Sequence, residues 1–275
     1  MHQYDGLSMS KIIINLQHLI SRSFTNSPLL GLTLAAALLV HPLLGQAQPL
    51  AQSFSAGNPT SKPVQHSLWR SAATNTSHKL LGYVKLTLNA LHHTRYRFGG
   101  KRFDTAKGIY SVDCSGYVNN LLGLSNPHAF HEILNQQQIS RPNTTDYYRF
   151  LGHIPYGRSS SHWYHVRGIS ELRAGDILVY SSPGRSKRRS PGHVMIVVET
   201  PKRDSRATGI YHVRVADSAH SGHSYDTRRP HTSGIGVGTL LLKANPHTNQ
   251  PIAFAWREDS RWKLGVDFAM GRMIG

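Results

Sequence analysis

The stretch DCSGYVNNLL, residues 113–122, carries the single cysteine of the 275-residue chain where a helix is predicted to begin. Its apolar residues recur at helical spacing and a glycine follows them, which is typical of a helix end. We therefore predict a helix from Cys114 to Leu122 whose first turn holds the thiol. Backbone N–H groups of a first turn have no partner within the helix. Such groups can lower the pKa of a thiol and donate to a developing oxyanion.

Working outward, a helix precedes this stretch and a run of strands follows it. Ser77 is the predicted N-cap of the earlier helix, and apolar residues recur at helical spacing after it. Five later segments have strand composition: DILVY (176–180), HVMIVVE (193–199), IYHVRVADS (210–218), VGTLLL (237–242) and IAFAW (252–256). Helices followed by strands favour an α+β architecture, an antiparallel sheet packed against an N-terminal helical part that carries the cysteine. Residues 125–170 stay largely unassigned, apart from a short helix predicted over 144–150.

The N-terminus predicts export. Residues 27–47 read SPLLGLTLAAALLVHPLLGQA, an apolar run that is broken by His41 and Pro42 and ends in small residues. This is the architecture of a signal peptide, with cleavage expected near Ala47 or retention as an N-terminal anchor. Residues 48–75 are rich in Ser, Pro, Gln and Thr and predict a flexible linker. We therefore expect residues 1–47 to act as the leader, residues 76–275 to form one catalytic domain, and the protein to reach the periplasm or the outside of the cell.

The charge of the chain predicts anionic partners. It has 31 Lys and Arg against 14 Asp and Glu, a formal charge of +17. Anionic wall polymers or a membrane surface would satisfy such a balance. Nucleic acid is not predicted, because the cations are scattered apart from a run at 185–189 and no binding module surrounds them. We expect a monomer without a cofactor.

The cysteine and one histidine are the predicted nucleophile and base. A single cysteine can form no internal disulfide, and Cys114 lies between Asp113 and Ser115 rather than among apolar neighbours, which favours function over an inert core role. Of 18 histidines, His193 opens an apolar strand directly after a glycine, a position that presents a side chain at the end of a sheet. We therefore predict Cys114 as nucleophile and His193 as base.

Three residues are candidates for the group that orients His193: His212, Asp217 and His220, on or just after the segment IYHVRVADS. Alternation along a strand places Asp217 on the face of Tyr211, Val213 and Val215. We expect this apolar face to turn toward the core and the cysteine helix, which puts Asp217 beside His193 and turns His212 away. On this view, Asp217→Asn should lower turnover with little loss of stability.

Four motifs, in order, carry a resemblance to a known family: YRFGG (96–100), DCSGYV (113–118), AGDILVY (174–180) and GHVMIVV (192–198). Together they resemble the NlpC-type family of cell-wall cysteine peptidases over about residues 80–242. The resemblance implies a papain-like fold, an acyl-enzyme on Cys114, His193 as general base and stem peptides of peptidoglycan as substrate. It also implies that Tyr96, Asp113 and Ser115 receive the amino end of the peptide.

The chain departs from the family pattern in four places. Phe98 stands where tryptophan is usual, and Asp217 stands where a third catalytic His, Asn or Gln is usual. The 24-residue step from His193 to Asp217 is longer than the usual hairpin, and residues 119–175 are enlarged.

Three other functions stay open. A related thiol amidase or acyltransferase would use the same cysteine and histidine on a different amide or ester. A zinc amidase is prompted by HAFH (128–131) and HSGH (220–223), but neither has the helical HExxH context, so no metal site is predicted. A non-catalytic binding protein of the cell envelope would use the basic surface and leave the cysteine and histidine unexplained.

Overall fold

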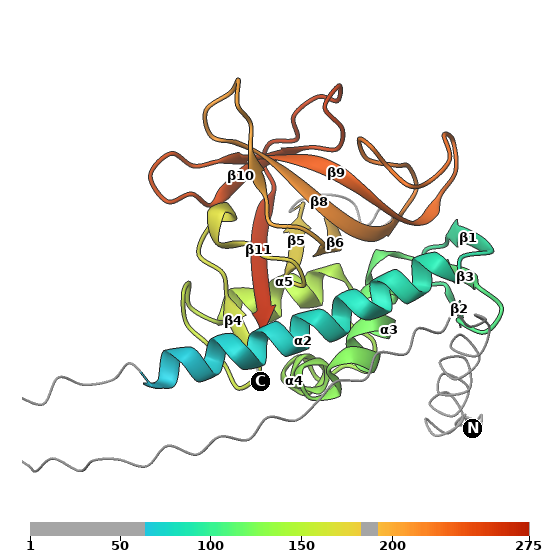
Figure 1. Ribbon diagram of the computed structural model, residues 1–275, viewed down its shortest axis with the longest axis horizontal. Helices are drawn as coiled ribbons and strands as arrows, with labels where there is room; N and C mark the ends of the chain where they lie inside the picture. The colour runs from blue at the N-terminus through green and yellow to red at the C-terminus, as the bar shows by residue number, and fades with distance from the viewer. Residues whose placement is uncertain (1–63, 183–191, 275) are drawn as a thin grey trace, which may run out of the picture. The chain divides into compact units, whose positions relative to one another are not determined.

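The computed structural model describes residues 64–182 and 192–274, with side-chain positions from residue 75 onward (Figure 1). The predicted leader, residues 48–63 of the predicted linker and the basic run at 185–189 lie outside the described residues. Within the described part of the chain, no helix is both long enough and apolar enough to cross a membrane.

Four α-helices precede most of the strands. They are α2 (Val64–Asn89), α3 (Cys114–Ser125), α4 (Pro127–Gln137) and α5 (Thr144–His153). The helix α3 begins at Cys114, as predicted, and ends three residues later than expected, at Ser125. Both α4 and α5 belong to the 119–175 segment, and the predicted short helix there begins at Thr144 but continues to His153.

The predicted start of the first helix is wrong. The helix α2 begins at Val64 instead of after Ser77, so residues 64–75 of the predicted linker are helical. No proline or glycine occurs between residues 64 and 81, so nothing in the sequence ends the helix where the apolar periodicity stops. Ser77 is buried within α2, where it packs so closely on the turn at Gly175 that a Cβ on that glycine would lie 2.6 Å from the Ser77 Cβ.

An eight-stranded sheet forms the second half of the described chain. Five strands match the predicted ones: β5 (Ile177–Ser181), β6 (Gly192–Val197), β8 (Ile210–Ala219), β9 (Gly234–Ala244) and β10 (Pro251–Ala255). Three were not predicted: β4 (Trp163–His165), β7 (Lys202–Arg203) and β11 (Asp267–Met273). The order is β10-β9-β8-β6-β5-β11-β4, with β7 beside β8, and every pairing is antiparallel. The predicted α+β class with an antiparallel sheet is therefore confirmed.

A small sheet lies between α2 and α3 in the sequence. Its strands are β1 (His93–Tyr96), β2 (Lys101–Asp104) and β3 (Ile109–Val112), in the order β1-β3-β2. The paired glycines of YRFGG make the turn from β1 to β2, since Gly99 has a φ of +67° and a Cβ on Gly100 would lie 2.3 Å from the Ser111 carbonyl oxygen. This turn contacts the start of α3, because the Gly99 N–H donates a hydrogen bond to the Asp113 carboxylate.

The large sheet is buried on both faces. The helix α3 packs on β6 and β8, and its buried side chains join Val194 and Ile196 in one apolar cluster. The alternate residues of β6, Met195 and Val197, belong to a second cluster on the other face, lined by β8, β9, β10 and β11. Cys114 lies at the boundary, where the first turn of α3 meets the start of β6.

Candidate active site

Asp113 builds the turn that presents the thiol. It is the N-cap of α3, and its Oδ1 accepts hydrogen bonds from the Gly116 N–H at 2.7 Å and the Ser115 hydroxyl at 3.1 Å. Its Oδ2 accepts from the Gly99 N–H at 2.6 Å, so one carboxylate joins the helix start to the YRFGG turn. The local sequence thereby fixes the direction in which Cys114 points.

The Cys114 thiol lies among groups that favour its ionised form. Its side chain is buried, with Sγ 3.6 Å from the Thr144 hydroxyl at the start of α5. Burial by itself opposes ionisation, but the charge of His193 and its hydrogen bond, with further hydrogen bonds from Val194 and Thr144, lower the pKa of the thiol below its usual range. The group has the character of an activated nucleophile.

His193 is held by the start of β6. The preceding Gly192 lies so close to β5 that a Cβ on it would come within 2.0 Å of the Tyr180 carbonyl oxygen, so glycine is required there. His193 Nε2 donates to Asp217 Oδ2 at 2.6 Å, which leaves Nδ1 for the thiol. Burial lowers the pKa of His193, but Cys114 and Asp217 outweigh this and raise it to about 10.

Asp217 reaches His193 by a different face from the one expected. Tyr211, Val213 and Val215 belong to the cluster on the far side of the sheet from α3, so the expectation that they face the cysteine helix is wrong. Val197 pairs with Val215, and His193 shares the Val197 face of β6, so alternation puts His193 and Asp217 on one face. Because both faces of this sheet are buried, apolar alternation cannot tell which one meets the helix.

Two further side chains, not expected from the sequence, hold Asp217. His223 Nε2 lies 2.9 Å from Asp217 Oδ2, and Arg228 Nη2 donates to Asp217 Oδ1 at 2.8 Å. Burial of Asp217 would raise its pKa, but the charges of His223 and Arg228 and the hydrogen bond from His193 hold it well below its usual range. The only sequence signal for this pair was the dense polar run between β8 and β9.

The other two candidates for the orienting group lie elsewhere. His212 faces away, with Nε2 2.7 Å from Asp204 Oδ2 and Nδ1 3.4 Å from Glu258 Oε1. His220 is exposed, and its ring lies against Tyr96 at a centroid distance of 3.9 Å. Of the three candidates, the structure brings Asp217 to His193.

A pocket of about 290 Å³ opens beside the thiol. Its walls come from three segments, with the lining residues Tyr96, Phe98, Gly99, Asp113, Cys114, Ser115, Arg141, Pro142, Asn143, Thr144 and Thr145. Tyr96, Asp113 and Ser115, the three predicted binding residues, therefore share one cavity. The enlarged 119–175 segment supplies a whole wall, which is held by Arg141 through hydrogen bonds to the carbonyl oxygens of Gly99 and Gly100.

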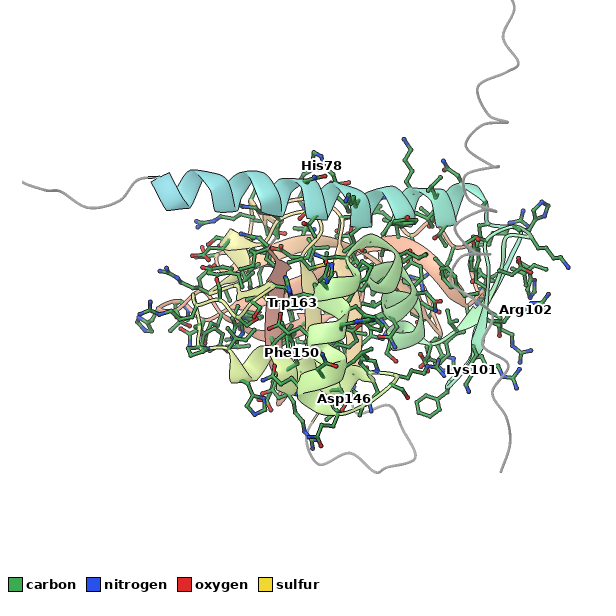
Figure 2. All side chains as sticks on the ribbon, turned by 90° about the horizontal axis from the view of Figure 1, so that it is seen from below. His78, Lys101, Arg102, Asp146, Phe150 and Trp163 are labelled. Atoms are coloured by element: carbon green, nitrogen blue, oxygen red, sulfur yellow. The ribbon has the colours of Figure 1, made fainter. Side chains whose placement is uncertain are left out.

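The start of α5 anchors the pocket wall that the 119–175 segment supplies. Asn143 caps α5, and its backbone N–H donates a hydrogen bond to the carboxylate of Asp146 (labelled in Figure 2) at 2.9 Å, which completes a capping box. Farther along the helix, Phe150 packs edge-on against Trp163 at 5.9 Å. The loop that carries Pro142, and Thr144 at the start of α5, are thereby tied to the core.

No family model, curated protein or solved structure matches this chain.

The arrangement can perform nucleophilic chemistry. The Cys114 thiol at the start of α3 is hydrogen-bonded to the His193 imidazole, which is hydrogen-bonded to the Asp217 carboxylate. The pocket opens beside the thiol. Among the described residues, no group of three or more His, Cys, Asp or Glu side chains is placed to hold a metal ion. His128 and His131, which prompted the zinc alternative, are both exposed on α4.

Proposed function

We propose that this protein is an exported cysteine hydrolase of papain-like type, which cleaves amide bonds in peptidoglycan stem peptides through an acyl-enzyme on Cys114. The observation that carries the proposal is the buried chain Cys114–His193–Asp217 at the start of α3, beside a pocket. A purely structural cysteine would have no need of a histidine held in this way.

The chemistry follows from the positions of the groups. The thiolate attacks the carbonyl carbon, and first-turn N–H groups donate to the oxyanion that forms. In the described chain, the Gly116 N–H is taken by Asp113 and the Tyr117 N–H by the Asp113 carbonyl, which leaves those of Cys114 and Ser115 as donors. The His193 imidazolium gives its proton to the leaving amine, and neutral His193 then activates the water that releases the acyl group.

The choice of substrate rests on three kinds of support. The predicted leader favours export, and the motif order resembles the NlpC-type family. The pocket brings together Tyr96, Asp113 and Ser115, which the resemblance assigns to the amino end of the peptide. Asp113 keeps a nearly buried carboxylate there, suited to an ammonium group.

The decisive experiment is digestion of purified peptidoglycan by the protein and by Cys114→Ala, with separation of the products by mass. We expect peptide fragments from the wild type and none from the variant, whose circular dichroism should be unchanged. Fragments released equally by Cys114→Ala would exclude the cysteine mechanism.

Alkylation of Cys114 by iodoacetamide near neutral pH distinguishes the remaining functions. Fast alkylation without fragment release would favour a thiol amidase or acyltransferase on another substrate. Alkylation no faster than in the denatured chain would favour the non-catalytic binding protein.

A further inference from the structure

We propose that His223 and Arg228 are positioning residues, which hold the Asp217 carboxylate in the orientation that His193 requires. This inference rests on the proposed function and deepens it, because it extends the site from three residues to five. Both side chains bind Asp217, which in turn binds His193, so both would act through Asp217.

The Arg228 guanidinium is held by hydrogen bonds to Asp226 and Gly234 as well as to Asp217. Its Nε and Nη2 donate to the two carboxylate oxygens of Asp226 at 2.8 and 2.7 Å, and Nη1 donates to the Gly234 carbonyl at 2.9 Å. Nη2 also donates to Asp217 Oδ1, and the side chain is only 2% exposed. A planar guanidinium held in this way fixes the plane of the carboxylate it binds.

His223 holds the other oxygen. Its Nε2 lies 2.9 Å from Asp217 Oδ2 and its Nδ1 lies 3.2 Å from the Trp256 carbonyl oxygen, so both ring nitrogens face acceptors. Donation from both nitrogens satisfies this geometry. The Trp256 indole covers the pair, since its ring lies 4.0 Å from the His223 ring and 5.2 Å, edge-on, from the His193 ring.

The backbone is shaped to accommodate these two residues. A Cβ on Gly236 would lie 2.5 Å from Arg228 Nε, and one on Gly238 would lie 2.5 Å from Asp226 Oδ2 and 2.8 Å from the His223 Cβ. These alternate glycines of β9 let the loop between β8 and β9 lie directly on the strand. Gly236 also pairs with Asp217, so the loop meets the sheet at the catalytic carboxylate.

The charges give this arrangement a chemical consequence. A buried carboxylate with a single neutral partner would tend to take up a proton, and it would then be a poor acceptor for the imidazolium. Hydrogen bonds from His223 and Arg228 keep Asp217 ionised, and the carboxylate can still accept the hydrogen bond from His193. Loss of either donor should weaken the thiolate–imidazolium pair without removing any group that forms it.

The test is the rate constant of Cys114 alkylation as a function of pH, which needs no substrate. Arg228→Met and His223→Phe should each lower the rate near pH 7 by about tenfold or more, because the thiol returns toward its ordinary pKa. Arg228→Lys, which keeps the charge but loses the fork, should recover part of the rate. Each variant is assayed at a temperature at which circular dichroism shows it to be folded.

Arg272 provides a matched control. It forms a similarly buried, two-pronged ion pair with Asp176 at 2.7 and 2.8 Å, on the side of β5 where that strand begins. Tyr180, which pairs with His193, follows Asp176 by four residues, a distance of roughly 13 Å along an extended strand. Arg272→Met should therefore lose stability and keep the wild-type alkylation profile.

The outcomes separate this inference from the proposed function. A wild-type thiol that reacts slowly would overturn both. A fast wild-type thiol whose rate is unchanged in folded Arg228→Met and His223→Phe would overturn the positioning role alone. An equal loss of rate in Arg272→Met would show that general destabilisation, and not the position of Asp217, controls the thiol.

A second observation, the charge of the small sheet, carries an independent inference: we infer that this sheet binds an extended anionic polymer. Arg95, Arg97, Lys101 and Arg102 are all exposed, and none of them forms an ion pair within the described residues. Lys101 and Arg102 lie together on the small sheet (Figure 2). The nearest acidic residue in the sequence, Asp104, binds the Lys107 N–H.

The position of these cations links the surface to the pocket. Phe98 and Gly99, in the turn between β1 and β2, line the pocket beside the thiol. A polymer bound along β1 and β2 would therefore run past the active site. Phe98, which is 75% exposed, is the one large apolar side chain exposed on β1, β2 and the turn between them. A single apolar side chain is too little to insert this surface into a bilayer. A polymer therefore fits the surface better than a membrane does.

The probe is labelled inorganic polyphosphate, titrated by fluorescence anisotropy at several salt concentrations. The variant R95S/R97S/K101S/R102S should bind at least about tenfold more weakly at low salt, with a salt slope reduced by roughly 2–3. The control K202S/R206S/R261S/K263S loses the same charge near the opposite end of β9, where Lys263 pairs with Phe254. It should bind nearly as the wild type.

Two results would overturn the polymer surface. Equal weakening in both variants would assign binding to net charge alone. Wild-type binding to vesicles that contain phosphatidylglycerol, without binding to polyphosphate, would assign the surface to a membrane.

Discussion

At the scale of single residues, the proposed function depends on the transfer of a proton from Cys114 to His193. The pKa of the thiol is lowered and that of His193 is raised to about 10, although burial acts against both shifts. These directions favour the thiolate–imidazolium pair near neutral pH. We expect alkylation of Cys114 to reach its plateau well below pH 8.5, the ordinary pKa of a cysteine, and to stay level up to about pH 10.

Alkylation rates of the folded chain from pH 5 to pH 10 measure this plateau. The guanidinium-denatured chain is the reference, and its rate should rise around pH 8.5. A folded-state profile that rises over the same range would mean that His193 does not share the proton.

Asp217 should matter for stability as well as for catalysis. It is fully buried with Arg228 and His223 on its oxygens, so Asp217→Asn would leave His223 without its carboxylate partner and Arg228 with Asp226 alone, at a cost of about 3–5 kcal/mol at pH 7. This changes the expectation from sequence alone, which was little loss of stability. Because the folded pKa of Asp217 is depressed, its stabilisation is present above pH 4 and is lost as the pH falls through the folded pKa.

Urea unfolding of the wild type and Asp217→Asn at pH 7 and pH 3 checks the sign. The difference between the two proteins should be smaller at pH 3. A difference that grows on acidification would show that the carboxylate is not stabilised in its ionised form.

The sequence identified the residues of the site that lie in regular elements. Cys114 and His193 were recognisable because each lies at the start of an element with clear periodicity, and Asp217 because it lies near the end of one. His223 and Arg228 were missed because they lie in an irregular loop, whose fold is set by tertiary contacts with Gly236. Without an alternation to read, a loop residue in a polar run cannot be distinguished from a solvated one.

At the scale of elements, the strands with long apolar runs were predictable, whereas the short or polar strands, and β11 with its Gly271 and Arg272, were not. All five segments with apolar runs are strands, whereas no residue of β1 or β2 is buried, and both strands owe their pairing to β3. The N-terminal half of α2 lacks the apolar periodicity that located its C-terminal half. Such elements form through tertiary packing and backbone hydrogen bonds, which single-sequence patterns do not report.

The helix α2 offers a stabilising substitution. Gly82 is exposed in its interior, and a Cβ there would meet nothing within 4 Å. Because glycine loses more backbone entropy than alanine in a helix, Gly82→Ala should stabilise the protein by about 0.5–1 kcal/mol in urea unfolding. Gly175→Ala should do the opposite, because its φ is +92° and its Cβ would press on Ser77. Equal effects of the two substitutions would mean that α2 does not pack on that turn.

At the scale of the whole molecule, the charge is unbalanced in a way that the ion pairs do not relieve. The chain carries 31 Lys and Arg against 14 Asp and Glu, and among the described residues six arginines and no lysine form ion pairs with carboxylates. Two of those six, Arg228 and Arg272, are buried, so the surface retains most of the positive charge. Repulsion between these cations opposes the compact state.

Salt should therefore stabilise this protein. At 0.15 M ionic strength the Debye length falls to about 8 Å, which screens exposed cations while leaving the buried pairs of Arg228 and Arg272 nearly untouched. We expect the Tm of the full chain to rise by roughly 2–4 °C between 0.02 and 0.3 M NaCl, equivalent to about 1 kcal/mol. The variant K202S/R206S/R261S/K263S should show a smaller rise, because it has fewer like charges to screen. A Tm that falls with salt in the wild type would mean that attractive surface pairs outweigh the repulsion, and the excess charge would then have no cost to folding.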